Sequence, residues 1–121
     1  MILGIDFGTS GARAIVIDEE KNICAKVQHP FQKSRAENWT IAWKKALFNL
    51  IGSIPLEIRQ KIKAIAIDGT SSTVLLCDRK GNPIDAPILY NDARGQIVLD
   101  RVQAIAPPNH TVLSSTSSLA K

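Results

Sequence analysis

The chain has 121 residues, of which 45% are hydrophobic, and this length and composition fit one globular domain with a sizeable core. Its net charge of +4 permits binding of anions, but the basic residues are scattered and form no stripe interleaved with aromatic residues, so we expect no nucleic-acid partner. No apolar run approaches the roughly 20 residues that cross a bilayer, and the first residues carry no basic leader, so we expect no membrane partner. Cys24 and Cys77 lie in strand-like surroundings without a CxxC spacing and are interpreted as free thiols, which favours a cytoplasmic protein.

Three strand-like runs open the chain. Apolar residues predict strands over 2–7, 12–18 and 23–29, and the polar run 18–22 predicts the turn between the last two. Because the connections are so short, these strands are expected to form an antiparallel meander.

The first strand delivers one acid, Asp6, into a turn of small residues that reads Gly8-Thr9-Ser10-Gly11. A carboxylate at the end of a buried strand costs free energy unless something pairs with it, and glycine and hydroxyl residues offer donors suited to phosphate. The turn joins two strands and lacks the P-loop pattern, which would open a helix. It therefore predicts another kind of site for a metal-bound polyphosphate.

The spacing of the apolar residues becomes helical from Asn38 onward, with Asn38 as the expected N-cap and Gly52 as the expected end of the helix. Trp39 and Trp43 are interpreted as core anchors of this helix. A short helical turn is expected after Pro55.

A further strand that ends in an acid follows. Residues 62–68 predict a strand closed by Asp68, and residues 69–73 repeat the small-residue turn of the opening motif. If this strand pairs in parallel with the first, Asp6 and Asp68 lie near one another at strand ends where ligands gather. The β-β-β-α-β order predicts an α/β protein with a mixed sheet of the ribonuclease H-like fold, which serves both actin-type ATPases and metal-dependent nucleases.

The last third of the chain is predicted to hold two extended runs, 74–78 and 84–89, on either side of a turn at 79–83. A helix is expected over 91–106, because apolar residues recur there at helical spacing.

Three ordered motifs resemble the start of an FGGY-family carbohydrate kinase: Asp6-Phe7-Gly8-Thr9-Ser10, Asp68-Gly69-Thr70-Ser71-Ser72 and Leu89-Tyr90-Asn91-Asp92-Ala93-Arg94. The resemblance covers nearly the whole chain and implies an actin-like ATPase lobe. The Ser/Thr-rich tail that ends in Leu119-Ala120-Lys121 is similar to the xylulose or ribulose kinases of cyanobacteria and plants. For a plant relative a plastid location is open, although this sequence shows no transit peptide.

The resemblance implies that ATP and Mg²⁺ are the cofactors. Asp6 would orient Mg²⁺, directly or through water, near the transferred phosphoryl group, with Thr9 beside it in the catalytic site. The implied phosphate-binding residues are Gly8, Thr9, Ser10, Gly11 and Arg13. Arg13 would act as a cation on the phosphate side, and a structural ion pair is the alternative interpretation of this residue.

The implied sugar-binding residues are Thr70, Ser71, Asn91, Asp92 and Arg94, with Ser71 as the preferred contact. Many members of the family have Trp where Tyr90 stands, so the exact sugar stays open. A helix N-terminal cap with a local ion pair is the alternative interpretation of residues 91–94.

Members of the family are much longer, with a second lobe that binds adenine and a catalytic Asp, the general base, that would lie downstream of Lys121. We therefore expect residues 1–121 to be an incomplete N-terminal lobe of a kinase, without the second lobe and without appreciable turnover alone.

The leading hypothesis is phosphoryl transfer from ATP to a hydroxyl of a ketopentose, xylulose or ribulose, by the longer protein. Two alternatives stay open at this point. One is a metal-dependent nuclease of the ribonuclease H-like fold. The other is a non-catalytic lobe that binds nucleotide or associates with copies of itself through apolar surfaces.

Overall fold

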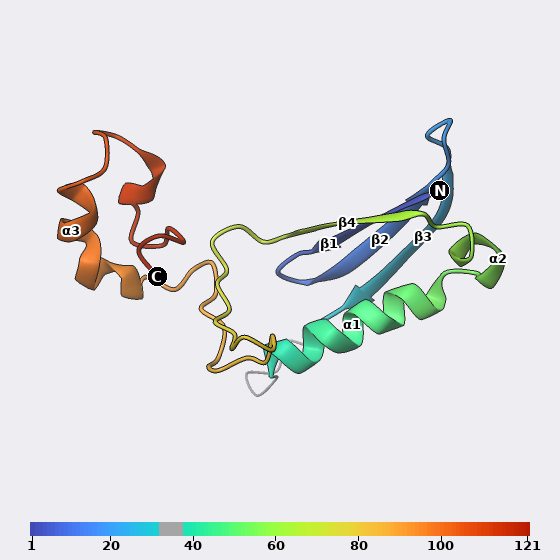
Figure 1. Ribbon diagram of the computed structural model, residues 1–121, viewed down its shortest axis with the longest axis horizontal. Helices are drawn as coiled ribbons and strands as arrows, with labels where there is room; N and C mark the ends of the chain where they lie inside the picture. Colours follow the sequence, from blue (N-terminus) through green and yellow to red (C-terminus); the bar gives the residue numbers. More distant parts are fainter. Residues whose placement is uncertain (32–37) are drawn as a thin grey trace. The chain divides into compact units, whose positions relative to one another are not determined.

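The computed structural model describes residues 1–31 and 38–121. The chain divides into two compact units, Met1–Thr70 and Ser71–Lys121, and each is described by itself. The first unit holds the sheet and the long helix, and the second is built mainly from turns and short helices (Figure 1). No helix among the described residues is both long enough and apolar enough to cross a membrane.

Four strands form one mixed sheet in the first unit, in the order β3-β2-β1-β4 (Figure 1). The first three, β1 (Ile2–Phe7), β2 (Gly11–Ile17) and β3 (Ile23–Pro30), pair antiparallel as the predicted meander. The fourth, β4 (Ala64–Gly69), pairs in parallel with β1. The predicted strands, their order and the parallel pairing are therefore confirmed, with ends that differ by one or two residues.

The long helix α1 (Trp39–Ser53) begins where the sequence predicts it. The side chain of Asn38 caps it, since Oδ1 accepts hydrogen bonds from the backbone N–H groups of Thr40 and Ile41 at 3.1 and 3.4 Å. The prediction that Gly52 ends the helix is wrong, because Gly52 lies inside its last turn.

Pro55 gives the physical reason for the later end. A proline disfavours the helical conformation of the residue before it, and that residue, Ile54, is extended with φ −73° and ψ 128°. The short helix α2 (Leu56–Arg59) then follows, as predicted for the segment after Pro55.

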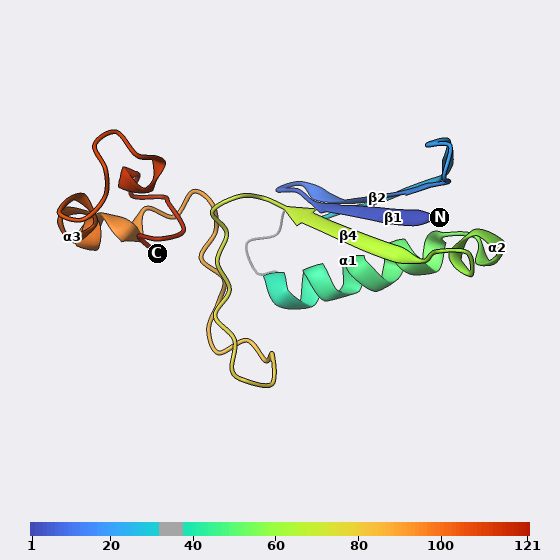
Figure 2. The ribbon, with the colours of Figure 1, turned by 45° about the horizontal axis from the view of Figure 1, so that its top comes forward.

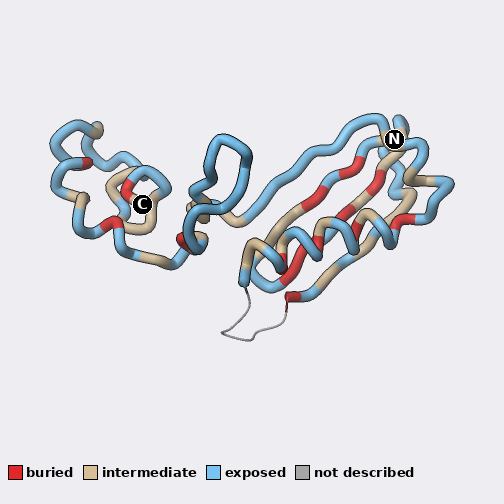
Figure 3. Tube along the Cα trace, turned by 60° about the horizontal axis from the view of Figure 1, so that its bottom comes forward, coloured by how far each residue is buried: buried red, intermediate tan, exposed pale blue. Residues whose placement is uncertain are grey.

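The core lies between α1 and one face of the sheet (Figures 2 and 3). Alternate residues of the strands point to this face, and every fourth residue of α1 meets them. The buried members include Leu3, Ile5, Ala12, Ala14, Val16, Ala42, Ala46 and Leu50. Trp39 and Trp43 are partly buried against this cluster, and Trp39 meets the ring of Phe31 edge to face at 5.7 Å, so both act as anchors of the helix.

The second unit contains the two extended runs that the sequence predicts on either side of a turn. Residues 74–78 and 84–89 form a hairpin-like pair around a turn in which Gly81 has φ +81°. Two isolated antiparallel bridges, Val74 to Ile88 and Cys77 to Pro83, and a hydrogen bond from the N–H of Ile84 to the carbonyl of Leu76 connect this region. Two prolines, Pro83 and Pro87, lie in the returning segment, and each lacks the N–H that a ladder needs. A regular pair of strands is therefore not formed.

The single helix predicted over 91–106 is also wrong. The segment forms a 3-10 helix, η1 (Arg94–Val98), and then a short helix, α3 (Leu99–Gln103). Only one apolar residue of α3, Val102, is buried, so the apolar stripe has no second surface against which to extend the helix. A further 3-10 turn, η2 (Thr111–Leu113), follows.

Candidate functional site

The β1–β2 hairpin carries the small-residue turn. The backbone N–H of Gly8 donates to the carbonyl of Gly11 at 3.0 Å, which leaves Thr9 and Ser10 as the exposed tip. The Ser10 carbonyl accepts a hydrogen bond from the N–H of Phe31 at 3.0 Å, so the groups that this turn can offer to a ligand are the hydroxyls and N–H groups of Thr9 and Ser10.

Gly11 lies against the backbone of β3. A Cβ atom at this position would lie 2.7 Å from the carbonyl oxygen of His29 and 3.0 Å from Cα of Pro30. These neighbours are main-chain atoms that cannot rotate away, so close packing of β2 on β3 requires glycine here.

The substitution Gly11→Ala is expected to lower the free energy of unfolding by about 1–3 kcal/mol, the usual cost of forcing a methyl group into a packed site. Urea unfolding followed by circular dichroism measures this. Gly52→Ala is the matched control, because a Cβ atom there meets nothing within 4 Å. We expect the control to be neutral or stabilising, and equal effects of the two substitutions would contradict the close approach at Gly11.

Two acids meet at the ends of neighbouring strands, as predicted. Asp6 of β1 and Asp68 of β4 are partners in the parallel register, and Arg13 of β2 is the partner of Asp6 on the other side. All three lie on the sheet face opposite α1, because strand residues alternate between faces. They line an open depression of about 430 Å³ whose floor is the backbone and apolar side chains of β1, β2 and β4.

The Asp6 carboxylate forms an ion pair with Arg13, whose Nη1 lies 3.4 Å from Oδ2. The two side chains are 49% and 57% exposed. Half-exposed pairs of this kind contribute only about 0–1 kcal/mol, so the pair can open at little cost. Both interpretations of Arg13 thus remain compatible: it pairs with Asp6 here and can also meet an incoming anion.

Asp6 and Asp68 form a donor set that fits Mg²⁺. This cation keeps several of its waters and takes one or two carboxylates together with phosphate oxygens. Among the described residues, no group of three or more His, Cys, Asp or Glu side chains could hold a metal by itself. A Mg²⁺ ion held by these two carboxylates would therefore take its remaining ligands from water and from phosphate oxygens.

The turn after β4 is tied to the end of β1. The backbone N–H and the hydroxyl of Thr70 both donate to the carbonyl of Phe7, at 2.9 and 3.2 Å. This predicted sugar contact is thus bonded to Phe7, the residue that precedes Gly8. The hydroxyl proton of Thr70 is already used in this bond. Thr70 can still accept a hydrogen bond from a ligand.

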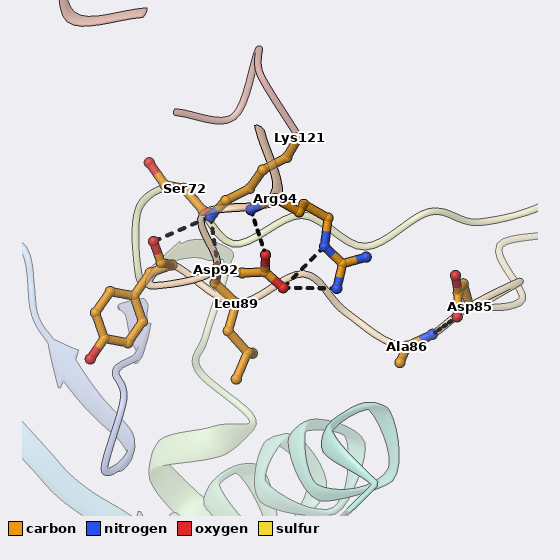
Figure 4. A network of polar contacts seen from close by, with 8 residues as sticks. Ser72, Asp85, Ala86, Leu89, Asp92, Arg94 and Lys121 are labelled. Atoms are coloured by element: carbon orange, nitrogen blue, oxygen red, sulfur yellow. Dashed lines mark hydrogen bonds and ion pairs between the residues drawn. The ribbon is translucent and has the colours of Figure 1, made fainter. Parts of the chain in front are cut away.

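The other predicted sugar-binding residues belong to the second unit. Arg94 donates through Nε and Nη2 to Oδ2 of Asp92, at 3.0 and 2.8 Å, and its backbone N–H donates to Oδ1 at 2.9 Å (Figure 4). These bonds hold the pKa of Asp92 below its usual value, with smaller contributions from the charges of Arg94 and Lys121. Ser71 and Asn91 are exposed. The local ion pair of the alternative interpretation is present, whereas Ala93, the residue that caps η1, makes no side-chain cap.

Lys121 joins this group, although no motif in the sequence predicts a role for it. Its Nζ atom donates to the carbonyl oxygens of Ser72, Leu89 and Tyr90, at 2.5, 2.7 and 3.2 Å (Figure 4). A lone lysine after a run of serine and threonine carries no local signal of such a role, since its acceptors are 31 to 49 residues away.

A mixed α/β sheet that gathers two carboxylates and a hydroxyl-tipped hairpin at one edge defines a class of protein that can bind a metal-bound phosphate. The model of the FGGY family of carbohydrate kinases, N-terminal domain, matches residues 1–120. The chain belongs to this family.

Similar proteins of known sequence or structure agree with this assignment. A xylulose kinase of Staphylococcus epidermidis is 31% identical over 115 residues, which cover 87% of this chain and 23% of that protein. The crystal structure of a xylulose kinase from Brucella ovis matches with a TM-score of 0.66 and 27% identity, over 84% of this chain and 23% of that one. A Plasmodium falciparum glycerol kinase solved with ADP shares the fold, with a TM-score of 0.75 and 23% identity over 98% of this chain and 27% of that one.

This chain spans about a quarter of the length of these relatives. The residues described above therefore correspond to one part of the proteins that they resemble.

Proposed function

We propose that this chain is the N-terminal part of an ATP-dependent kinase that phosphorylates a ketopentose, xylulose or ribulose. One observation carries the proposal. Asp6 lies one residue before the end of β1, near the open Thr9-Ser10 hairpin and beside Asp68, in a chain that belongs to a family of carbohydrate kinases. The sheet would be the incomplete first lobe of a ribonuclease H-like, actin-like fold, and the second lobe would lie in the remaining three quarters of the longer protein.

The first unit would bind the phosphate end of ATP. Asp6 would hold Mg²⁺ directly or through water, while the N–H and hydroxyl groups of Thr9 and Ser10 would donate to phosphate oxygens. Gly8 and Gly11 would let the phosphate approach the backbone of the turn closely. When bound, Mg²⁺ neutralises charge on the transferred phosphoryl group. Arg13 would leave its exposed pair with Asp6 and meet the same phosphate.

The sugar would be bound by Thr70 and Ser71 at the turn after β4 and by Asn91, Asp92 and Arg94. Short hydroxyl groups can both donate and accept hydrogen bonds with sugar hydroxyls. The two side-chain bonds from Arg94 lower the pKa of Asp92 and fix its orientation, and its remaining lone pairs can accept from a sugar hydroxyl. The general base would come from the part of the protein outside these 121 residues.

Family membership favours this kinase over the nuclease and over the non-catalytic lobe. The similar proteins are named for two different substrates, xylulose and glycerol. The choice of a ketopentose is therefore part of our proposal and does not follow from family membership.

The test is a coupled assay of ADP release by the longest polypeptide whose reading frame contains these residues. We expect turnover with MgATP and xylulose or ribulose, with kcat/KM at least tenfold above that for glycerol. No ADP release with either ketopentose, or turnover with glycerol alone, would overturn the substrate assignment. A reading frame that stops after Lys121 would overturn the proposal that this chain is part of a longer kinase.

The 121-residue chain by itself serves as the control. We expect no ADP release above background from it, because positioning of both substrates and the general base are each worth orders of magnitude in rate, about 10²- to 10⁴-fold for the base alone.

A further inference from the structure

We propose that Lys121 is a positioning residue of the sugar site: its ammonium group fastens the turn at Ser71-Ser72 to the segment Leu89–Asp92. The proposal rests on the function proposed above, because that function gives these two segments their role. Lys121 itself is not one of the predicted sugar-binding residues.

The contact uses the full bonding capacity of the side chain. A lysine ammonium group has three donors and no acceptor, and here three backbone carbonyls surround it, those of Ser72, Leu89 and Tyr90. One charge thus holds two segments that are separated by more than fifteen residues in the sequence. Hydrogen bonds with a charged donor are stronger than neutral ones, and all three contacts come from the charged ammonium group.

The turn that Lys121 bonds contains a residue with an unfavourable backbone conformation. Ser72 has φ +60°, a left-handed conformation that residues other than glycine adopt rarely. Such conformations persist where the surroundings fix them, and they gather at functional sites. The carbonyl of this strained residue is one of the acceptors of Lys121, so the ammonium group bonds the turn directly next to Ser71, the preferred sugar contact.

The backbone before Lys121 is itself well fixed. Ala120 is buried and packs so closely on Gly95 that a Cβ atom at Gly95 would lie 2.6 Å from the Cβ of Ala120. The hydroxyl of Ser117 donates to the carbonyl of Val112 and accepts from the N–H of Ala120. Lys121 therefore extends from an anchored corner, next to η1 and the Asp92–Arg94 pair.

Lys121 also acts on Asp92 through its charge. It adds to the effect of Arg94 in lowering the pKa of this carboxyl group. The same side chain thus fixes the backbone on either side of the predicted sugar contacts and supports the ionised form of one of them.

The test uses the longest polypeptide that contains these residues, with Lys121→Met to remove the three bonds at similar length and Lys121→Arg to keep the charge. Lys80→Met is the matched control, since Lys80 is an exposed lysine at a turn of the same unit. Initial rates are measured against the ketopentose at saturating MgATP, and against MgATP at saturating ketopentose. Amide hydrogen exchange is followed at Val74, Ile88 and Asp92, and at Leu3 of β1 for reference.

For Lys121→Met we expect the KM for the sugar to rise about 10- to 100-fold, the range that follows from losing hydrogen bonds to a charged group. The KM for ATP should stay within about twofold of the wild-type value, and exchange should accelerate at least tenfold at the amides of the second unit but not at Leu3. Lys121→Arg should be intermediate, because a planar guanidinium cannot point three donors at carbonyls that surround one atom. Lys80→Met should match the wild type.

The outcomes separate the two proposals. Unchanged exchange in Lys121→Met overturns the bridging role whether or not the protein is a kinase. Faster exchange in an active enzyme with an unchanged sugar KM, or with equal rises in both KM values, overturns the positioning role and leaves a purely structural lysine. If the wild type shows no activity with ketopentoses, the proposed function fails and the positioning role fails with it, while faster exchange would still establish the bridge itself.

Discussion

Replacement of Asp6 by Asn should lower kcat of the longer polypeptide on the order of 10²- to 10³-fold, the usual cost of losing one preorganised electrostatic group from a reacting centre. The amide keeps the shape of the side chain but lacks the negative charge with which, in the proposed function, Asp6 would hold Mg²⁺ beside the transferred phosphoryl group. The KM for the sugar should stay within about threefold of the wild-type value, because Asp6 lies at the phosphate side. Steady-state kinetics with the coupled assay measure both constants.

Glu57→Gln is the matched control for this experiment. It removes the same charge from an exposed position in α2, outside the site, and should leave kcat unchanged. Because Asp6 and Arg13 are about half exposed, Asp6→Asn should leave the unfolding midpoint close to that of the wild type. A kcat within fivefold of the wild-type value in a folded Asp6→Asn protein would remove Asp6 from the catalytic site.

The second large effect concerns stability. Truncation of Leu50 to Ala is expected to lower the free energy of unfolding by about 2–5 kcal/mol, because it leaves a cavity between α1 and the sheet. Leu50 is only 1% exposed and belongs to the cluster that includes Leu3 and Val16. A loss of this size is a large fraction of the roughly 5–15 kcal/mol that stabilises a typical domain. Urea unfolding at equilibrium measures it.

Ile41→Ala on the same helix provides the comparison. Ile41 is 64% exposed, so its truncation should change the free energy of unfolding by no more than about 0.5 kcal/mol. A change below 1 kcal/mol for Leu50→Ala, or equal losses for the two variants, would mean that α1 does not pack on the sheet as described.

Local patterns in the sequence were sufficient for most of the first unit. The alternation of apolar residues predicted β1, β2, β3 and β4, and Asn38 marked the start of α1 through a cap that depends on only a few neighbouring residues. The phosphate-site prediction also rests on a local pattern. Asp6 and its turn are contiguous, and parallel pairing of β4 with β1 was enough to bring Asp68 beside Asp6.

The errors fell where a longer-range or competing effect decided the structure. Pro55 ended α1, so the glycine at position 52 did not. A helical spacing of apolar residues over 91–106 did not yield one helix, since most of its stripe has no surface to cover.

By itself the sequence determined the class of fold, the family resemblance and the position of the small-residue turn between β1 and β2, because each depends on contiguous motifs or on a short period. Only the tertiary structure decided what holds the second unit together. The ammonium group of Lys121 bonds carbonyls 49 and 32 residues away, and Gly95 is required by Ala120, so neither relation leaves a local pattern. Hydrogen bonds to backbone carbonyls depend on where the chain passes, and that is set by packing in three dimensions.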